Sequence, residues 1–158
     1  MMLRAVRPSR TTDMPVIAKP RWIRRGYDAM TFFGHIITHS QQEAVAFLCS
    51  GPLKNHEMIH LYQARDCHDS WCLFYLRYGW YWLCASRYYK HLKNAGYLLN
   101  PFEMEAYRYM NNLHYLDDKE NGATEWRRYA CMSLKDRLEE YQRKNVLEKI
   151  NSRFLITY

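Results

Sequence analysis

The feature of this sequence that most constrains its fold is an aromatic and apolar stretch from Ser70 to Ser86, SWCLFYLRYGWYWLCAS. A helix that crosses a bilayer needs about 20 consecutive apolar residues. This stretch is shorter and carries Arg77 and Gly79 near its middle. It therefore predicts a helix in a protein core or at an interface rather than a transmembrane helix. Aromatic side chains bury a large area each, so a chain of 158 residues with 16% aromatic content can assemble one core from them.

The charge balance of the chain favours some partners over others. Lys and Arg number 23 against 16 Asp and Glu, which gives a net charge of +7 with neutral histidines. That charge permits contact with an anionic membrane surface or an acidic partner. The basic residues are dispersed and form no motif that reads nucleic acid, so we expect no nucleic acid as a partner. The oligomeric state stays open.

The cysteines indicate the cellular compartment. Their number is odd, no two of them form a CxxC pair, and no secretory hydrophobic segment with a cleavage site opens the chain. We therefore expect reduced, mostly buried thiols in a cytoplasmic protein, with contact to a membrane surface as an open alternative. The cysteines are Cys49, Cys67, Cys72, Cys84 and Cys131.

The chain is expected to consist of a tail and one domain. Residues 1–19 are basic, contain Pro8 and Pro15 and lack periodicity, which predicts a flexible basic N-terminal tail. Residues 20–158 are then long enough for one domain but not for two cores of useful size.

Local patterns predict an α+β fold that is mainly helical. β-Branched and aromatic residues from Thr31 to Thr38 predict one or two strands, with Gly26 and Gly34 at turns or bulges. Residues Gln41–Cys49 fit either a short helix or a continuation of the sheet. Further helices follow, two of them with a proline in the first turn and one of these capped by Asn100. They cover about Pro52–Ala64, Trp71–Tyr89, Pro101–Tyr115 and Trp126–Asn151.

Two histidines one helical turn apart provide the strongest chemical signal. They stand in Asn55–Gln63, NHEMIHLYQ, where His56 and His60 project from the same face of the predicted helix. In this geometry two imidazoles can bind one zinc ion, while Glu57 can reach a metal-bound water. The alternative interpretation is a polar helix face that carries two surface histidines.

A zinc site of this kind needs a third protein ligand and leaves one position for water. The segment Asn100–Tyr107, NPFEMEAY, supplies Glu103 and Glu105 at the start of another predicted helix. Carboxylates are stabilised at a helix N-terminus whatever else they do, so either glutamate alone is a weak signal. The aromatic helix between the two motifs is long enough to bring them together in antiparallel orientation. The two glutamates should point to different faces, and we favour Glu103 as the ligand.

The combination of the two motifs resembles the gluzincin class of zinc metallopeptidases. It is more closely similar to small bacterial proteins, frequent in Bacteroidetes, that carry an NHExxHxxQ helix followed by an FExEAY helix. The resemblance covers about residues 20–116. It implies a minimal zincin core, in which a short N-terminal strand or sheet packs beside an active-site helix and a glutamate helix. It also implies one zinc ion and the hydrolysis of peptide or protein substrates by a metal-activated water.

By motif position, the resemblance implies that His56, His60 and Glu103 are the zinc ligands and that Glu57 is the general base. Many gluzincins have an aspartate four residues after the ligand glutamate, where it orients a ligand histidine. Here Tyr107 stands at that position, and its phenol could hydrogen-bond an imidazole. The other candidates for a supporting role near the metal are Glu105, Asn55 and Gln63.

Two functions follow as hypotheses. The first is a zinc-dependent metallopeptidase in which the segment Met30–Thr38 borders the cleft beside His56 and aligns an extended peptide. The second is a non-catalytic module that binds a membrane surface or a protein and retains the metallopeptidase-like core. The aromatic helix, the positive charge and the small size of the chain favour this second hypothesis. The weaker signals are His35, His39, Cys67 with His68, His91 and His114.

Overall fold

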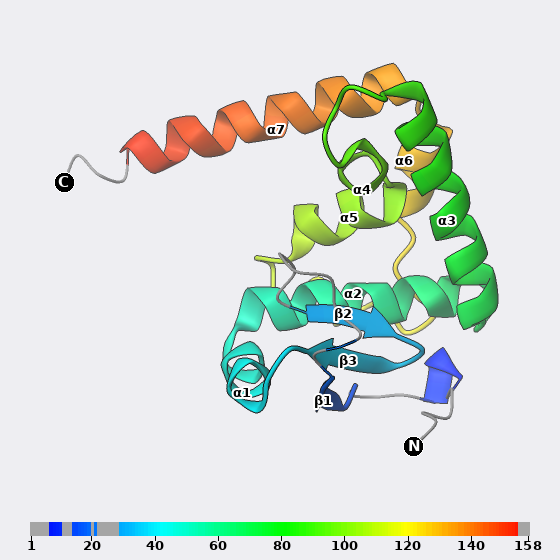
Figure 1. The fold of residues 1–158 in the computed structure, drawn as a ribbon, viewed down its shortest axis with the longest axis vertical. Helices are drawn as coiled ribbons and strands as arrows, with labels where there is room; N and C mark the ends of the chain where they lie inside the picture. The colour runs from blue at the N-terminus through cyan, green and yellow to red at the C-terminus, as the bar shows by residue number, and fades with distance from the viewer. Residues whose placement is uncertain (1–6, 11–13, 20, 22–28, 155–158) are drawn as a thin grey trace.

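The computed structural model describes residues 7–10, 14–19, 21 and 29–154, with side chains as far as residue 145. The described chain is α+β and mainly helical, which confirms the predicted fold class. Helix α2 lies at the centre, with the sheet on one side and α5 on the other (Figure 1). The elements are a 3₁₀ helix (Pro8–Arg10), β1 (Val16–Ala18), β2 (Ala29–Phe32), β3 (His35–Thr38), α1 (Gln41–Cys49), α2 (Gly51–Asp66), α3 (Trp71–Tyr88), α4 (Ala95–Leu98), α5 (Pro101–Tyr109), α6 (Trp126–Cys131) and α7 (Leu134–Phe154).

The predicted aromatic strand region is a hairpin. β2 and β3 pair antiparallel, with Thr31 opposite Ile36, and the strand order in the sheet is β1-β3-β2. The two turn residues, Phe33 and Gly34, have φ angles of 46° and 85°. Positive φ at both positions is typical of a type I′ turn, and glycine tolerates it at the second position. Gly26, the other predicted turn residue, lies outside the described residues.

The predicted N-terminal tail contributes to the fold. Within residues 1–19, β1 pairs parallel to β3, with Val16 opposite Ile36. Met14, just before the strand, is buried in the main core. A strand of three residues is too short to show any periodicity, so the tail prediction was wrong for this part of the chain.

One serine connects the first two helices. The open alternative for residues 41–49 is resolved as helix α1, which Ser40 caps by accepting from the Glu43 N–H at 3.1 Å. Ser50 then ends α1 and caps α2, where its Oγ accepts from the Leu53 N–H. Such caps satisfy backbone donors that have no partner inside a helix.

The glutamate helix is shorter than predicted. Asn100 caps α5 as expected, since its side chain accepts from the Phe102 N–H at 3.2 Å. The helix ends at Tyr109 rather than near Tyr115. The Asn55 amide explains this end, because it donates to the backbone carbonyl of the last helical residue and to two carbonyls just beyond it. These carbonyls belong to Tyr109, Met110 and Asn112.

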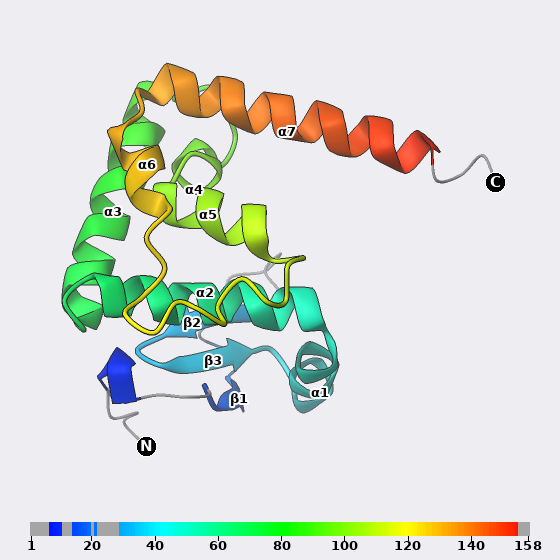
Figure 2. The ribbon, with the colours of Figure 1, turned by 180° about the vertical axis from the view of Figure 1, so that it is seen from behind.

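The predicted C-terminal helix is interrupted, at Met132 and Ser133. Ser133 starts α7 as a cap, because its Oγ accepts from the Asp136 N–H and donates to the Asp136 carboxylate. Arg137 then fixes α7 to the body, and its buried guanidinium donates to three backbone carbonyls. Beyond this anchor Glu140 and Lys144 still contact α5, through the Arg108 guanidinium and the Tyr107 carbonyl, and the last part of α7 extends away from the other helices (Figures 1 and 2). No helix in the described ranges combines the length and the apolar character needed to cross a membrane.

We predict that Gly122→Ala lowers the free energy of unfolding by at least about 2 kcal/mol, because both its conformation and its surroundings exclude a side chain. Gly122 has a φ of +118°, and a Cβ there would lie 2.5 Å from the Tyr62 carbonyl oxygen in α2. Gly79→Ala is the matched control, since a Cβ there meets no atom within 4 Å. It should raise stability by about 0.5–1 kcal/mol, because alanine is the better helix former. Urea denaturation measures both, and equal stability of the two variants would contradict the close approach at Gly122.

Candidate metal centre

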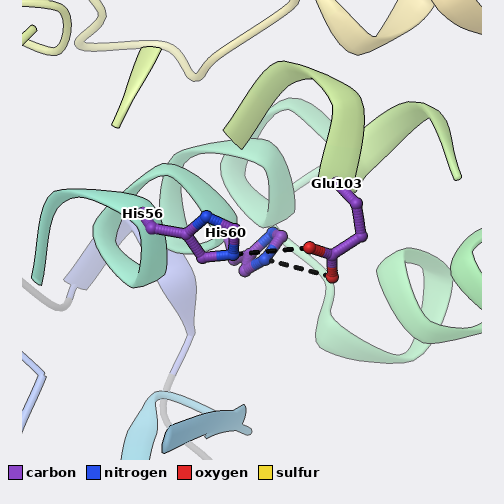
Figure 3. Close-up of side chains that lie close together, drawn as sticks. All are labelled: His56, His60 and Glu103. Carbon is purple, nitrogen blue, oxygen red and sulfur yellow. Dashed lines mark ion pairs between the residues drawn. The ribbon is translucent and has the colours of Figure 1, made fainter. Parts of the chain in front are cut away.

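Two helices bring the predicted ligands together. His56 and His60 project from one face of α2, and Glu103 projects toward them from the first turn of α5 (Figure 3). Each of the three offers a ligand atom, and these atoms lie within 4.8 Å of one another. All three side chains are buried, with no more than 5% of the surface of each residue exposed. The interpretation as a pair of surface histidines is therefore wrong.

The distances inside the cluster fit a metal ion better than they fit direct hydrogen bonds. His56 Nε2 lies 3.4 Å from Glu103 Oε2, and His60 Nε2 lies 3.5 Å from Glu103 Oε1. Charge-assisted N–H···O bonds are shorter, about 2.7–2.9 Å. Ligand atoms about 2.0–2.1 Å from a tetrahedral zinc ion lie about 3.3–3.5 Å apart. Glu103 Oε2 is also buried without a hydrogen-bond partner among the described residues, so a cation would satisfy it.

Charge holds the cluster together without a metal. Burial opposes protonation of His60, but the Glu103 carboxylate outweighs it and raises the pKa of His60 to about 9. Burial likewise favours the neutral acid of Glu103, yet the two imidazoles hold the pKa of that carboxyl well below its usual range. A metal ion that binds both groups takes the place of the shared proton.

Gln63 determines which nitrogen of His60 faces the cluster. The Gln63 amide nitrogen donates to the Phe102 carbonyl at 2.9 Å, and a carbonyl can only accept. The amide oxygen must then face His60 Nδ1, 2.8 Å away, and this nitrogen carries the hydrogen. Consequently Nε2 of the neutral imidazole presents its lone pair to the cluster, as a ligand must. Gln63 therefore orients His60, the supporting role for which it was a candidate.

Glu105 points away from the cluster into a separate buried network. Its carboxylate accepts from Gln63 Nε2 at 2.8 Å and from the Tyr115 hydroxyl at 2.6 Å. It also accepts from the backbone N–H groups of Glu125 and Trp126 at the start of α6. Burial raises the pKa of Glu105, against the effect of these donors. The structure thus brings Glu103 to the histidines and uses Glu105 to join α2, α5 and α6.

Glu57 lies on the same cavity as the cluster and is held by the sheet. Its Oε2 accepts a hydrogen bond from the Thr31 hydroxyl of β2. Thr31 and Glu57 are both buried to 9% exposure, so water competes little for this bond. Since Oε2 is engaged by Thr31, Oε1 is the Glu57 oxygen that has no hydrogen-bond partner within the described part of the chain.

Glu103 receives support from α3. The Tyr78 hydroxyl donates to Glu103 Oε1 at 2.7 Å, and the Asn100 amide donates to the Tyr78 backbone carbonyl at 3.1 Å. Asn100 therefore both starts α5 and ties this start to α3. The position of the carboxylate follows from a local cap and from a contact between two helices.

Tyr107 contacts a ligand histidine, but not through the predicted hydrogen bond to its free nitrogen. Its ring packs edge-on against the His56 ring, with 4.6 Å between the centroids. Its hydroxyl lies 2.9 Å from the hydroxyl of Tyr97. His56 Nδ1 has no hydrogen-bond partner within the described ranges. Ring packing rather than an orienting bond to Nδ1 is therefore the contribution of Tyr107.

A cavity of about 130 Å³ opens over the cluster. Met30 and Thr31 of β2 line one side of it, so the aromatic strand borders the site beside His56 as the sequence predicted. Sequence reasoning missed four polar side chains that line the cavity, because each is brought there by packing between distant segments. They are Thr31, Tyr75, Tyr78 and Tyr97. Of these four, only Thr31 could have been found from the sequence, because it lies in the strand that was expected to border the cleft.

The weaker candidates do not join the site. Among the described residues no second group of three His, Cys, Asp or Glu side chains is close enough to hold a metal. His35 lies in β3, so it shares no helical face with His39. Cys67 accepts a long contact from Arg77, and His114 is exposed beside Asp117. Of the five cysteines only Cys67 is buried, so the expectation of mostly buried thiols was wrong.

Comparisons with protein-family models, curated proteins and solved structures yield no match for this chain. The residues of this chain alone therefore indicate a metal centre. The features that indicate it are the donor set, its burial, the distances between ligand atoms and the orientation of His60.

We predict that the chain binds one zinc ion and that His56→Ala, His60→Ala or Glu103→Ala each removes stoichiometric binding, because two protein ligands rarely hold zinc tightly. Glu105→Ala should keep one zinc per chain and lose no more than about 10–100-fold in affinity, through Gln63. Metal analysis and calorimetric titration measure both, with circular dichroism to show that each variant is folded. Loss of zinc in Glu105→Ala but not in Glu103→Ala would transfer the ligand role.

Proposed function

We propose that this protein is a zinc-dependent metallopeptidase. The observation that carries the proposal is a buried cluster of His56, His60 and Glu103 with Glu57 on the same cavity. Two imidazoles and one carboxylate are a donor set that catalytic zinc sites use, and they leave a position for water or substrate. The resemblance of the two motifs to gluzincins supports the same assignment.

The chain's own residues suit the chemistry of peptide hydrolysis. Bound zinc would act as a Lewis acid that polarises the scissile carbonyl and lowers the pKa of water. Glu57 then acts as general base, since Oε1 can accept the proton of the attacking water and return it to the leaving amine. Thr31 keeps the other oxygen, Oε2, turned toward β2. The three ligands and Glu57 are buried, which limits competition from bulk water and strengthens electrostatic interactions at the site.

The shape of the site favours a peptide that lies across the cavity mouth. At about 130 Å³ the cavity is smaller than the roughly 300–1,000 Å³ pockets that enclose small molecules. β2 is an edge strand of the described sheet, and edge strands pair with extended peptides. The Tyr75 hydroxyl already occupies part of that edge, because it donates to the Thr31 carbonyl and accepts from the Phe33 N–H. In our proposal an extended peptide pairs with the Ala29–Thr31 part of the edge, and Tyr75 limits how far it runs.

We place this activity in the cytoplasm. All five cysteines are free, and free thiols suit a reducing compartment. The alternative hypothesis is a binding module without catalysis. It predicts that replacing Glu57 changes no rate of peptide hydrolysis.

We predict that Glu57→Gln lowers the rate of peptide hydrolysis by at least about 10²-fold, because the amide cannot accept the proton. Zinc binding should remain, since Glu57 is not among the predicted ligands. The side chain is nearly isosteric, so folding should not change. A peptide library digested in parallel by the parent and by Glu57→Gln measures the difference. A folded, zinc-loaded parent that cleaves no peptide faster than this variant would favour the binding module.

We predict that Thr31→Val lowers kcat about 10-fold with little change in KM, because Glu57 loses the hydrogen bond that positions it. Thr31→Ser keeps the hydroxyl and should restore most of the rate, which a purely steric role of threonine would not explain. Zinc content and thermal stability serve as controls in both variants. Equal rates in Thr31→Val and the parent would show that the contact does not position the base.

A further inference from the structure

Helix α3 has an outer face that no described element covers. The helix forms one side of the molecule, and its inner face carries the buried Trp71 and Phe74 (Figures 1 and 2). On the opposite side, Leu76 is 71% exposed, Trp80 64% and Leu83 44%. At 100° per residue these side chains fall on one stripe along the helix. We define the outer face of α3 as Cys72, Leu76, Gly79, Trp80, Leu83 and Arg87.

The charge around this face has one sign. From Ser70 to Phe102 the sequence contains Arg77, Arg87, Lys90 and Lys93 but no aspartate or glutamate. Arg87, Lys90 and Lys93 are exposed at and beyond the C-terminal end of α3. Within the described part of the chain none of these three forms an ion pair. An apolar stripe with a central tryptophan and a basic end is typical of helices that lie in a membrane interface.

We propose that the outer face of α3 docks onto an anionic lipid bilayer. The stripe from Cys72 to Leu83 carries no charged side chain. A protein partner would be expected to form about one hydrogen bond per 100–200 Å² of interface. A lipid surface requires no such polar contact at the stripe. A second copy packed on this face would offer no acidic side chain between Ser70 and Phe102 to pair with the basic end. An anionic bilayer accepts the apolar stripe between its headgroups and attracts the basic end.

This docking is independent of the proposed peptidase activity. The opposite face of α3 supplies Phe74, Tyr75 and Tyr78 to the metal cavity, so the helix serves two surfaces. The helix has 18 residues and a length of about 27 Å, and it would lie along the bilayer surface rather than across it. A failure of membrane binding leaves the metal centre unaffected, and a failure of hydrolysis leaves the docking face unaffected.

Vesicle flotation tests the proposal with the full chain. We expect it to float with vesicles of equal parts phosphatidylglycerol and phosphatidylcholine, and not with vesicles of phosphatidylcholine alone. The double variant Trp80→Ser/Leu83→Ser should lose at least about tenfold in vesicle affinity, because two apolar side chains no longer insert. The triple variant Arg87→Gln/Lys90→Gln/Lys93→Gln should lose about fivefold for each charge removed.

The matched control is Val45→Ser/Leu48→Ser on α1, which removes two apolar side chains that are 56% and 51% exposed. This control should float like the parent, and circular dichroism and zinc content should be unchanged in all variants. Absence of flotation, equal flotation with neutral vesicles, or full flotation of Trp80→Ser/Leu83→Ser would overturn the proposal. A dimer seen by light scattering and lost in Trp80→Ser/Leu83→Ser would assign the face to a second copy, and so would also overturn it.

Discussion

The structure depends on the burial of a polar helix face. Helix α2 buries polar side chains at its centre, and an unpaired polar group in a core costs a few kcal/mol. The surrounding elements therefore have to supply partners at fixed positions. β2 supplies the Thr31 hydroxyl, α5 supplies carbonyls and carboxylates, and α3 supplies the Tyr78 hydroxyl that holds Glu103. The buried polar residues of α2 are Asn55, His56, Glu57, His60 and Gln63.

One part of this polar face is left for a cation. The side-chain NH2 groups of Asn55 and Gln63 donate to backbone carbonyls and to Glu105, and these bonds fix α2 against α5. The Nε2 atoms of the two imidazoles face the Glu103 carboxylate, at distances longer than good hydrogen bonds. A site that is rigid at its rim and incompletely paired at its centre is preorganised for a metal ion.

The sequence predicted those elements whose signals are local. The caps at Asn100 and the proline-initiated starts of α2 and α5 act within one helical turn, so they could be read from neighbouring residues. Strand β1, the short helix α4 and the break before α7 were missed. β1 is stabilised by pairing with β3, and the break before α7 is accompanied by the contact of Arg137 with carbonyls of Leu99 and α6. Such long-range contacts leave no periodic trace in a short segment.

The candidate metal centre likewise combines features set by the local sequence with features set by long-range packing. The spacing of His56 and His60 by itself determined that two imidazoles share one face, because helix geometry repeats every 3.6 residues whatever surrounds it. Tertiary structure decided that this face is buried and that Glu103 rather than Glu105 meets it. It also decided that Thr31 holds the Glu57 carboxylate. These outcomes depend on how α5 and β2 pack against α2, and that packing is set by the fit of whole surfaces rather than by any local pattern.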